Sequence, residues 1–226
     1  MKRLVMIALA LMVAVPAVGQ VEFTFEGFAM YDPAPDMVGA ALTVYGIANP
    51  PVSVPTPIPM DFVNFQYTVH VTGMTVATYV LDIGDGTKTY TFNGGVIHIF
   101  EDPIATGTAG NYAAPGTFVD GTMLLEATVD DGWEMLLDDP FGLSVYSGAG
   151  IGACDMVAGA AYPLLVSMDY ELNDWVFAGT GISEPWWPFI TVPDGYDHVF
   201  GIKIIFPYDP TANEDATWGE VKTLFR

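Results

Sequence analysis

Cysteine is almost absent from this chain of 226 residues, in which Cys154 is the single example. One cysteine excludes an intramolecular disulfide, so burial of apolar surface has to stabilise the fold. Cys154 lies in the segment Gly-Ile-Gly-Ala-Cys-Asp-Met, among small apolar residues. That setting favours a buried small hydrophobe, with a reactive or intermolecular thiol as the alternative.

Positive charge is also scarce, because six Lys and Arg residues face 27 Asp and Glu residues. A net charge of −21 repels polyanions and thus excludes nucleic acid and anionic lipid surfaces as partners. Cations, cationic polymers, neutral glycans and other cell-surface components remain possible partners. Charged residues make up only 15% of the chain and hydrophobic residues 51%, which excludes a disordered protein.

The chain begins with Met-Lys-Arg, continues as an apolar run from Leu4 to Val15, and then carries small residues at Ala17 and Gly19. This order predicts a bacterial, Sec-type signal peptide over residues 1–19. The apolar run is too short to span a bilayer comfortably, so no membrane span is expected after cleavage. Removal of two basic residues with the signal leaves four against 27 acids, a net charge of −23. The expected location is secreted or cell surface, with the periplasm as a further possibility.

Catalytic signatures are missing as well. The sequence has no Gly-x-Ser-x-Gly, no His-Glu-x-x-His and no phosphate-binding glycine loop. His70, His98 and His198 are scattered, whereas a zinc site needs clustered ligands. These absences predict that the protein is not an enzyme and has no catalytic residues. An extracellular hydrolase using paired carboxylates stays as an alternative, on the adjacent acids Glu101–Asp102, Asp130–Asp131 and Asp138–Asp139.

No long amphipathic helix pattern is present, but extended segments are frequent. From Asn64 to Thr72 polar and apolar residues alternate strictly, which predicts a strand with one buried and one solvated face. Such strands are typical of antiparallel sheets. Repeated strands and turns predict an all-β fold, either an antiparallel jelly-roll-like β-sandwich or a closed barrel of about ten strands.

Three local predictions follow from the same patterns. Thr87–Phe92 and Val96–Glu101 flank Asn93-Gly94-Gly95, which predicts a tight hairpin with either Gly94-Gly95 or Asn93-Gly94 as its loop. The glycines between Gly148 and Ala161 argue against a stable helix and favour small-residue strands or a tightly packed loop. Leu164–Tyr170 is predicted as a strand.

The mature chain is expected to form one domain over residues 20–209. Five prolines between Asn49 and Pro59 indicate an extended loop within that domain. Residues 210–226 are predicted as a polar linker followed by a short C-terminal amphipathic helix. Thr217 and Glu220 have the spacing of a capping box, and Trp218 and Val221 fall on one face.

Trp186, Trp187 and Tyr196 are the candidate ligand-binding residues. They lie in or near the Pro-rich loop Ser-Glu-Pro-Trp-Trp-Pro-Phe. Exposed aromatic rings on loops stack against the apolar faces of sugars, which points to glycan binding. The alternative is that the two indoles cover an open end of the core.

Asp82 and Asp85 are the candidate metal ligands, in the turn Asp-Ile-Gly-Asp-Gly-Thr. Two carboxylates on one loop suit an oxygen-seeking cation, so calcium is the expected ion if one is bound. Asp and Gly are also what a tight turn requires, which is the alternative.

The sequence therefore predicts a secreted, acidic, all-β binding or structural module at the cell exterior. It would bind glycans through loop aromatics and be stabilised by calcium. A small outer-membrane β-barrel is a further alternative, because alternation and aromatic content fit one.

Overall fold

The computed structural model describes residues 22–50, 56–84, 86–138, 146–168, 170–183 and 192–206. The predicted signal peptide and C-terminal helix lie outside the described residues. Within them the chain is nearly all β, as predicted, with ten strands and two short helices. In chain order these are β1 (Glu22–Asp32), β2 (Ala41–Ala48), β3 (Phe65–Leu81), β4 (Lys88–Asn93), β5 (Gly95–Pro103), η1 (Pro115–Phe118), β6 (Thr122–Val129), β7 (Trp133–Asp138), β8 (Ser147–Ala158), α2 (Tyr162–Ser167), β9 (Trp175–Ser183) and β10 (His198–Ile205).

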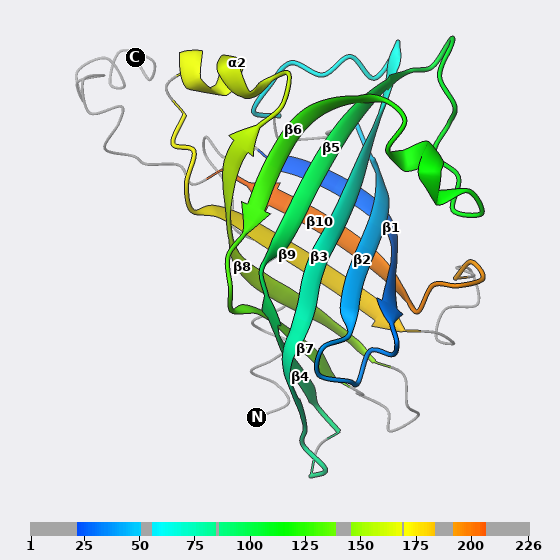
Figure 1. The fold of residues 1–226 in the computed structure, drawn as a ribbon, viewed down its shortest axis with the longest axis vertical. Coiled ribbons are helices and arrows are strands. Elements are labelled where there is room, and N and C mark those ends of the chain that lie inside the picture. The colour runs from blue at the N-terminus through cyan, green and yellow to red at the C-terminus, as the bar shows by residue number, and fades with distance from the viewer. Residues whose placement is uncertain are drawn as a thin grey trace, which may run out of the picture.

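Eight of the strands form a closed antiparallel barrel (Figure 1). Their order around the ring is β2-β1-β10-β9-β8-β6-β5-β3, and pairing of β2 with β3 closes it. Front and rear strands cross in projection, as the tilt of barrel strands requires (Figure 1). Closure gives every strand of the ring two hydrogen-bonded neighbours and so removes the exposed edges of a sandwich.

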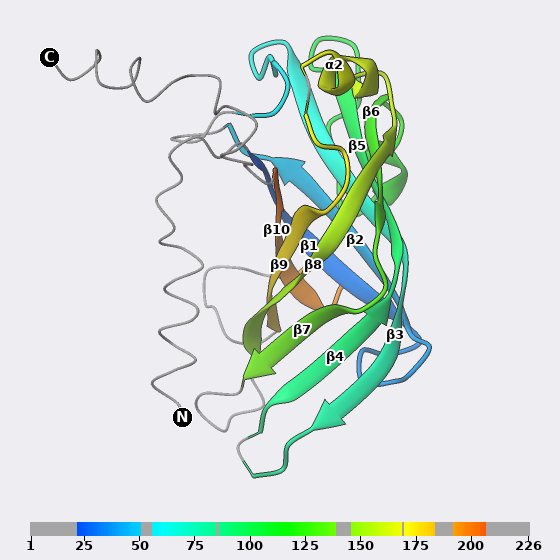
Figure 2. The same ribbon diagram turned by 90° about the vertical axis from the view of Figure 1, so that its left-hand side faces the viewer.

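The remaining strands, β4 and β7, extend the sheet between the long strands β3 and β8 (Figure 2). Thr75–Leu81 of β3 pairs with β4, and Phe65–Thr72 of the same strand pairs with β5. The predicted hairpin around Asn93-Gly94-Gly95 is therefore wrong in both registers. β4 and β5 follow one another along β3 instead of pairing, and the chain reverses at Asp82–Thr87, where the Asp82 amide donates to the Thr87 carbonyl (2.8 Å).

The barrel interior is filled by apolar side chains. The alternation expected for Asn64–Thr72 is observed, with Tyr67, Val69 and Val71 buried inside. Tyr90 and Phe92 of β4 and Ile97 and Ile99 of β5 all belong to the same core. Among the described residues of this core, the largest fully buried side chains are Trp133, Trp175, Tyr67, Tyr90, Phe23, Phe25, Phe92, Phe177 and Phe200.

The glycine-rich segment around Gly150 forms strand β8, in agreement with the expectation of small-residue strands. Its glycines make room for Trp133, whose indole lies inside the barrel and donates from Nε1 to the Phe177 carbonyl (2.9 Å). A Cβ on Gly150 would lie 2.1 Å from the Trp133 ring, and one on Gly152 would lie 2.6 Å from it. Glycine is therefore required at these positions by space.

The predicted strand Leu164–Tyr170 is wrong, because Tyr162–Ser167 forms helix α2. Pro163 lies in the first turn, where its missing N–H costs nothing, and Leu165 anchors the helix in the core. Apolar residues in so short a run do not distinguish a strand from a buried helical turn.

An excursion over residues 104–121, which includes η1, lies on the outer surface of β2 and β3. It explains why Thr68 is only 2% exposed although its side chain points out of the barrel. The Thr68 hydroxyl donates to the Phe118 carbonyl (2.8 Å), and this bond fixes the excursion to the barrel wall.

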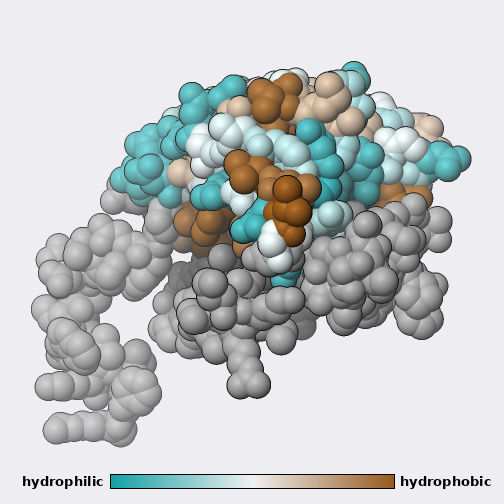
Figure 3. Space-filling model, turned by 90° about the horizontal axis from the view of Figure 1, so that it is seen from below, coloured by the Kyte–Doolittle hydropathy of each residue, from teal (hydrophilic) through white to brown (hydrophobic). Residues whose placement is uncertain are grey.

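The lower end of the molecule carries exposed apolar side chains among hydrophilic ones (Figure 3). The β1–β2 connection contributes Met37 and Val38, and the β3–β4 end contributes Val80, Leu81 and Ile83. The two segments are joined by the hydrogen bond from the Gly39 amide to the Val76 carbonyl (2.7 Å). Ile83 is 92% exposed and contributes nothing to the core.

Candidate functional site

A second group of aromatic rings lies outside the barrel, and we call it the outer aromatic cluster. It draws on β1, β2, β3, the excursion and the β9–β10 connection, and its members are Phe28, Tyr45, His70, Tyr112, Phe118 and Tyr196. None of them belongs to the barrel core, although Phe118 is completely buried. The other five are half-buried, so the cluster is open to solvent on one side.

The rings of this cluster contact one another in several geometries. Phe28 meets Tyr112 edge-on at 4.6 Å between ring centroids, and Tyr112 packs against Phe118 at 4.8 Å. Tyr196 stands perpendicular to Tyr112 at 5.8 Å. These distances lie in the range in which aromatic pairs stabilise one another beyond simple burial.

Two hydrogen bonds order the tyrosines of the outer aromatic cluster. The Tyr112 hydroxyl donates to the Glu26 carbonyl, and the Tyr196 hydroxyl donates to the Tyr112 carbonyl, both at 3.3 Å. Burial raises the pKa of Tyr112 to about 12, with smaller contributions from Tyr196 and Glu26. Burial also raises the pKa values of Tyr45 and Tyr196. All three phenols therefore keep their protons at neutral pH and remain hydrogen-bond donors.

From the outer aromatic cluster, a row of ionisable residues runs across the neighbouring strands β2, β3, β5 and β6. Strand register places Tyr45 opposite His70, His70 opposite His98, and His98 opposite Glu126. The ring of His70 stacks on Tyr45 at 4.7 Å and lies 6.1 Å from that of His98. Burial, and then the proximity of His98, lower the pKa of His70, which stays neutral at physiological pH.

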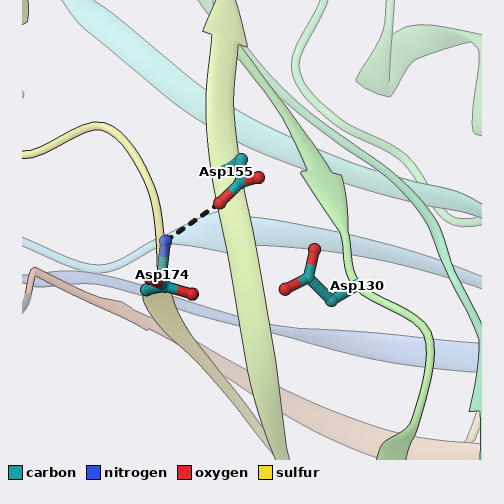
Figure 4. A group of neighbouring side chains, drawn as sticks. All are labelled: Asp130, Asp155 and Asp174. Atoms are coloured by element: carbon teal, nitrogen blue, oxygen red, sulfur yellow. Dashed lines mark hydrogen bonds between the residues drawn. The ribbon is translucent and has the colours of Figure 1, made fainter.

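Three carboxylates converge on the opposite side of the barrel (Figure 4). Asp130 follows β6, Asp155 lies on β8 and Asp174 precedes β9, and one oxygen of each lies within 4.8 Å of the others. The Asp174 amide donates to Asp155 Oδ1 (2.9 Å), the bond drawn in Figure 4. Burial, and then the charges of Asp155, Asp174 and Asp131, raise the pKa of Asp130. Oxygen ligands of this kind suit calcium.

A group of polar side chains, from exposed Asp36 to buried His198, lies at the lower end of the barrel. Asp36 Oδ2 pairs with Lys88 Nζ (2.8 Å), and its Oδ1 accepts from the Tyr90 hydroxyl (2.5 Å). Nearby, Asp197 Oδ2 accepts from the Tyr31 amide (2.8 Å). Within the described part of the chain, His198 Nδ1 is buried without any hydrogen-bond partner. Burial lowers the pKa of His198, opposed by Asp197 and Asp36 and assisted by Lys88.

Acid lability is the expected consequence of burying His198. The unfolded chain takes up a proton near the ordinary pKa of 6.5, whereas folded His198 resists protonation. The stability that this difference contributes is complete well above pH 6.5 and is lost as the pH falls through and below that value. His198→Phe should reduce the loss of unfolding free energy between pH 6.5 and 5.5 by up to about 1 kcal/mol. Urea denaturation at the two pH values measures this loss, with Ile83→Ala as the control variant. If His198→Phe lost as much unfolding free energy between the two pH values as the natural protein, His198 would have to become protonated in the folded state.

The predicted site residues are only partly brought together. Tyr196 lies in the outer aromatic cluster, whereas Trp186 and Trp187 fall outside the described residues. Asp82 is exposed and its Oδ1 accepts from the Gly84 amide (2.7 Å), so this carboxylate supports its own turn. Asp85 also lies outside the described residues.

Sequence reasoning missed most of the outer aromatic cluster and the pairing of His70 with His98. One signal was available, since Phe28 is out of phase with the inward-facing Phe23 and Phe25 of the same strand. The cross-strand neighbours of His70 come from strand register, which depends on the whole barrel.

Comparison of the chain with protein-family models, with curated proteins and with solved structures finds no match to any of them. Across the described ranges, no helix reaches the length and apolarity that a bilayer span requires.

Proposed function

We propose that this protein is a non-catalytic binding module, exported to the cell exterior, that holds neutral glycans on the outer aromatic cluster. The observation that carries the proposal is the gathering of half-exposed rings, including Tyr196, outside a barrel whose interior is already filled. None of these rings is part of the barrel core, and grouped aromatic rings on a surface mark interaction sites.

The chemistry of the cluster suits sugars. Aromatic rings contact the apolar faces of sugar rings, and protonated phenols donate hydrogen bonds to sugar hydroxyls. The raised pKa values of Tyr45, Tyr112 and Tyr196 keep those donors in place. A strongly negative chain repels polyanionic polymers, which leaves neutral glycans as the favoured class.

Glycan binding is tested by screening the mature protein on a glycan array and measuring the best ligand by titration calorimetry. Tyr196→Ala should weaken binding at least tenfold, about 1.4 kcal/mol, because one ring and its hydroxyl are lost. Tyr196→Phe should retain more affinity than Tyr196→Ala. Val166→Ala removes exposed apolar surface on α2, away from the cluster, and should bind as the natural protein does.

The alternative role of these rings is to fix the excursion to the barrel. In that case Tyr196→Ala would lower the melting temperature while no glycan bound the natural protein. That pair of results would refute the glycan proposal.

We also propose that calcium stabilises the fold, supported by the convergence of Asp130, Asp155 and Asp174 and by the predicted turn site at Asp82 and Asp85. Without a cation the three carboxylates repel one another, so Asp130→Asn should raise the melting temperature in EDTA. Millimolar calcium should raise that of the natural protein and act less on Asp130→Asn. A response lost only in Asp82→Asn would assign the ion to the turn, and no response in any variant would remove calcium from the account.

A further inference from the structure

A groove of about 320 Å3 opens on the outer surface of the barrel, where β2 ends, β3 begins and the chain leaves β5. Its walls are mostly apolar, and aromatic rings contribute on one side. The residues lining it are Ile47, Ala48, Pro50, Phe62, Phe65, Gln66, Tyr67, Asp102, Pro103, Ile104, Gly107 and Ala109. None of them belongs to the outer aromatic cluster, so the groove is a separate site.

Asp102 is the only carboxylate among these lining residues. It is only 9% exposed, because the loop after β5 folds back over it. Gly107 approaches so closely that an added Cβ would lie 2.0 Å from Asp102 Oδ1, while its own amide donates to the Pro103 carbonyl (2.7 Å). The loop therefore encloses the carboxylate without hydrogen-bonding to it.

No group in the described part of the chain donates to the Asp102 carboxylate. Both lysines in that part are engaged elsewhere: Lys88 pairs with Asp36 at 2.8 Å, and Lys203 pairs with Glu22 at 3.0 Å. The neighbouring Gln66 uses its Oε1 to accept from the Gly110 amide (2.8 Å). His198 Nδ1 is the one fully buried, unpartnered side-chain atom in the described part of the chain, so the Asp102 oxygens stay accessible from the groove and can accept a donor from a ligand.

We propose that this groove binds the ammonium group of a small organic amine, with Asp102 as counter-ion and the apolar walls holding the carbon skeleton. A metal ion fits less well, since calcium takes six to eight oxygen ligands and the groove offers one carboxylate. The partly exposed rings of Phe62 and Phe65 also line the groove, and aromatic rings attract organic cations. The volume lies at the small end of the range for ligand pockets. The chain's negative charge also steers cations toward it.

The test compares three ligands of equal chain length: n-hexylammonium, hexanol and hexanoate. Titration calorimetry in 150 mM NaCl should show n-hexylammonium binding at least tenfold more tightly than the other two. Asp102→Asn should weaken the amine at least tenfold, because it removes the counter-ion. Asp120→Asn makes the same charge change on the exposed part of the excursion and should bind the amine as the natural protein does.

Ala109→Trp provides a second variant, because it fills the groove from an exposed position and leaves Asp102 intact. It should block the amine. Amine binding that survives Asp102→Asn or Ala109→Trp, or that is no tighter than hexanol binding, would overturn the proposal. Tighter binding of Nα-acetyl-lysine amide than of n-hexylammonium would identify the ammonium as a protein lysine side chain, and the reverse order would identify a free amine. Failure of glycan binding would leave these measurements unaffected.

Discussion

Replacing Trp133 with alanine is expected to lower the free energy of unfolding by about 3–5 kcal/mol, the largest effect of any single change considered for this protein. The indole is 1% exposed and packs against Phe92 and Phe177, at 5.3 and 5.5 Å between ring centroids. Its Nε1 also donates to the Phe177 carbonyl. Alanine removes the ring, leaves a cavity and loses this hydrogen bond.

Urea denaturation followed by circular dichroism measures this loss. Ile83→Ala serves as the matched control, because it removes an apolar side chain that is 92% exposed and should change stability by less than about 0.5 kcal/mol. Equal effects of the two substitutions would mean that Trp133 is not part of the folding core.

Gly150→Ala is expected to cost about 3 kcal/mol, since the added methyl group would overlap the Trp133 ring. The backbone of β8 cannot move away without breaking its ladder to β7 and β9. Gly116→Ala is the control, because a Cβ at Gly116 meets nothing within 4 Å. Denaturation midpoints of the two variants should differ clearly in urea.

A double-mutant cycle separates steric overlap from a general intolerance of side chains on β8. In a Trp133→Leu background, Gly150→Ala should cost under about 1 kcal/mol, giving a coupling of about 2 kcal/mol between the two positions. Additive effects would show that Gly150 is needed for another reason.

Much of the fold class was predictable because strand periodicity is a local property. The alternation between Asn64 and Thr72 assigns side chains to the inside or outside whichever strands lie next to it. The error at Asn93-Gly94-Gly95 has the opposite origin. A glycine pair is compatible with a hairpin turn and also with a short break between two strands that run in the same direction. The second arrangement is found because β3 is long enough to pair with β4 and β5 one after the other.

The candidate sites were less predictable for the same reason. Tyr196 was identified from its loop, but its contacts with Phe28 and Tyr112 join segments more than 80 residues apart in sequence. From sequence, Asp102 was identified only as one member of a pair of adjacent acids. Its burial depends on the excursion, whose path over the barrel has no signature in the sequence.

By itself, the sequence determined a disulfide-free, acidic chain whose polar and apolar residues alternate as a β-sheet requires, because composition and period depend on near neighbours alone. Tertiary structure decided that the sheet closes into a barrel, that Trp133 occupies a space left by the glycines of β8, and that Asp102 is enclosed without a partner. Each of these follows from strand register and from the path of the excursion, which are fixed only when distant segments pack together.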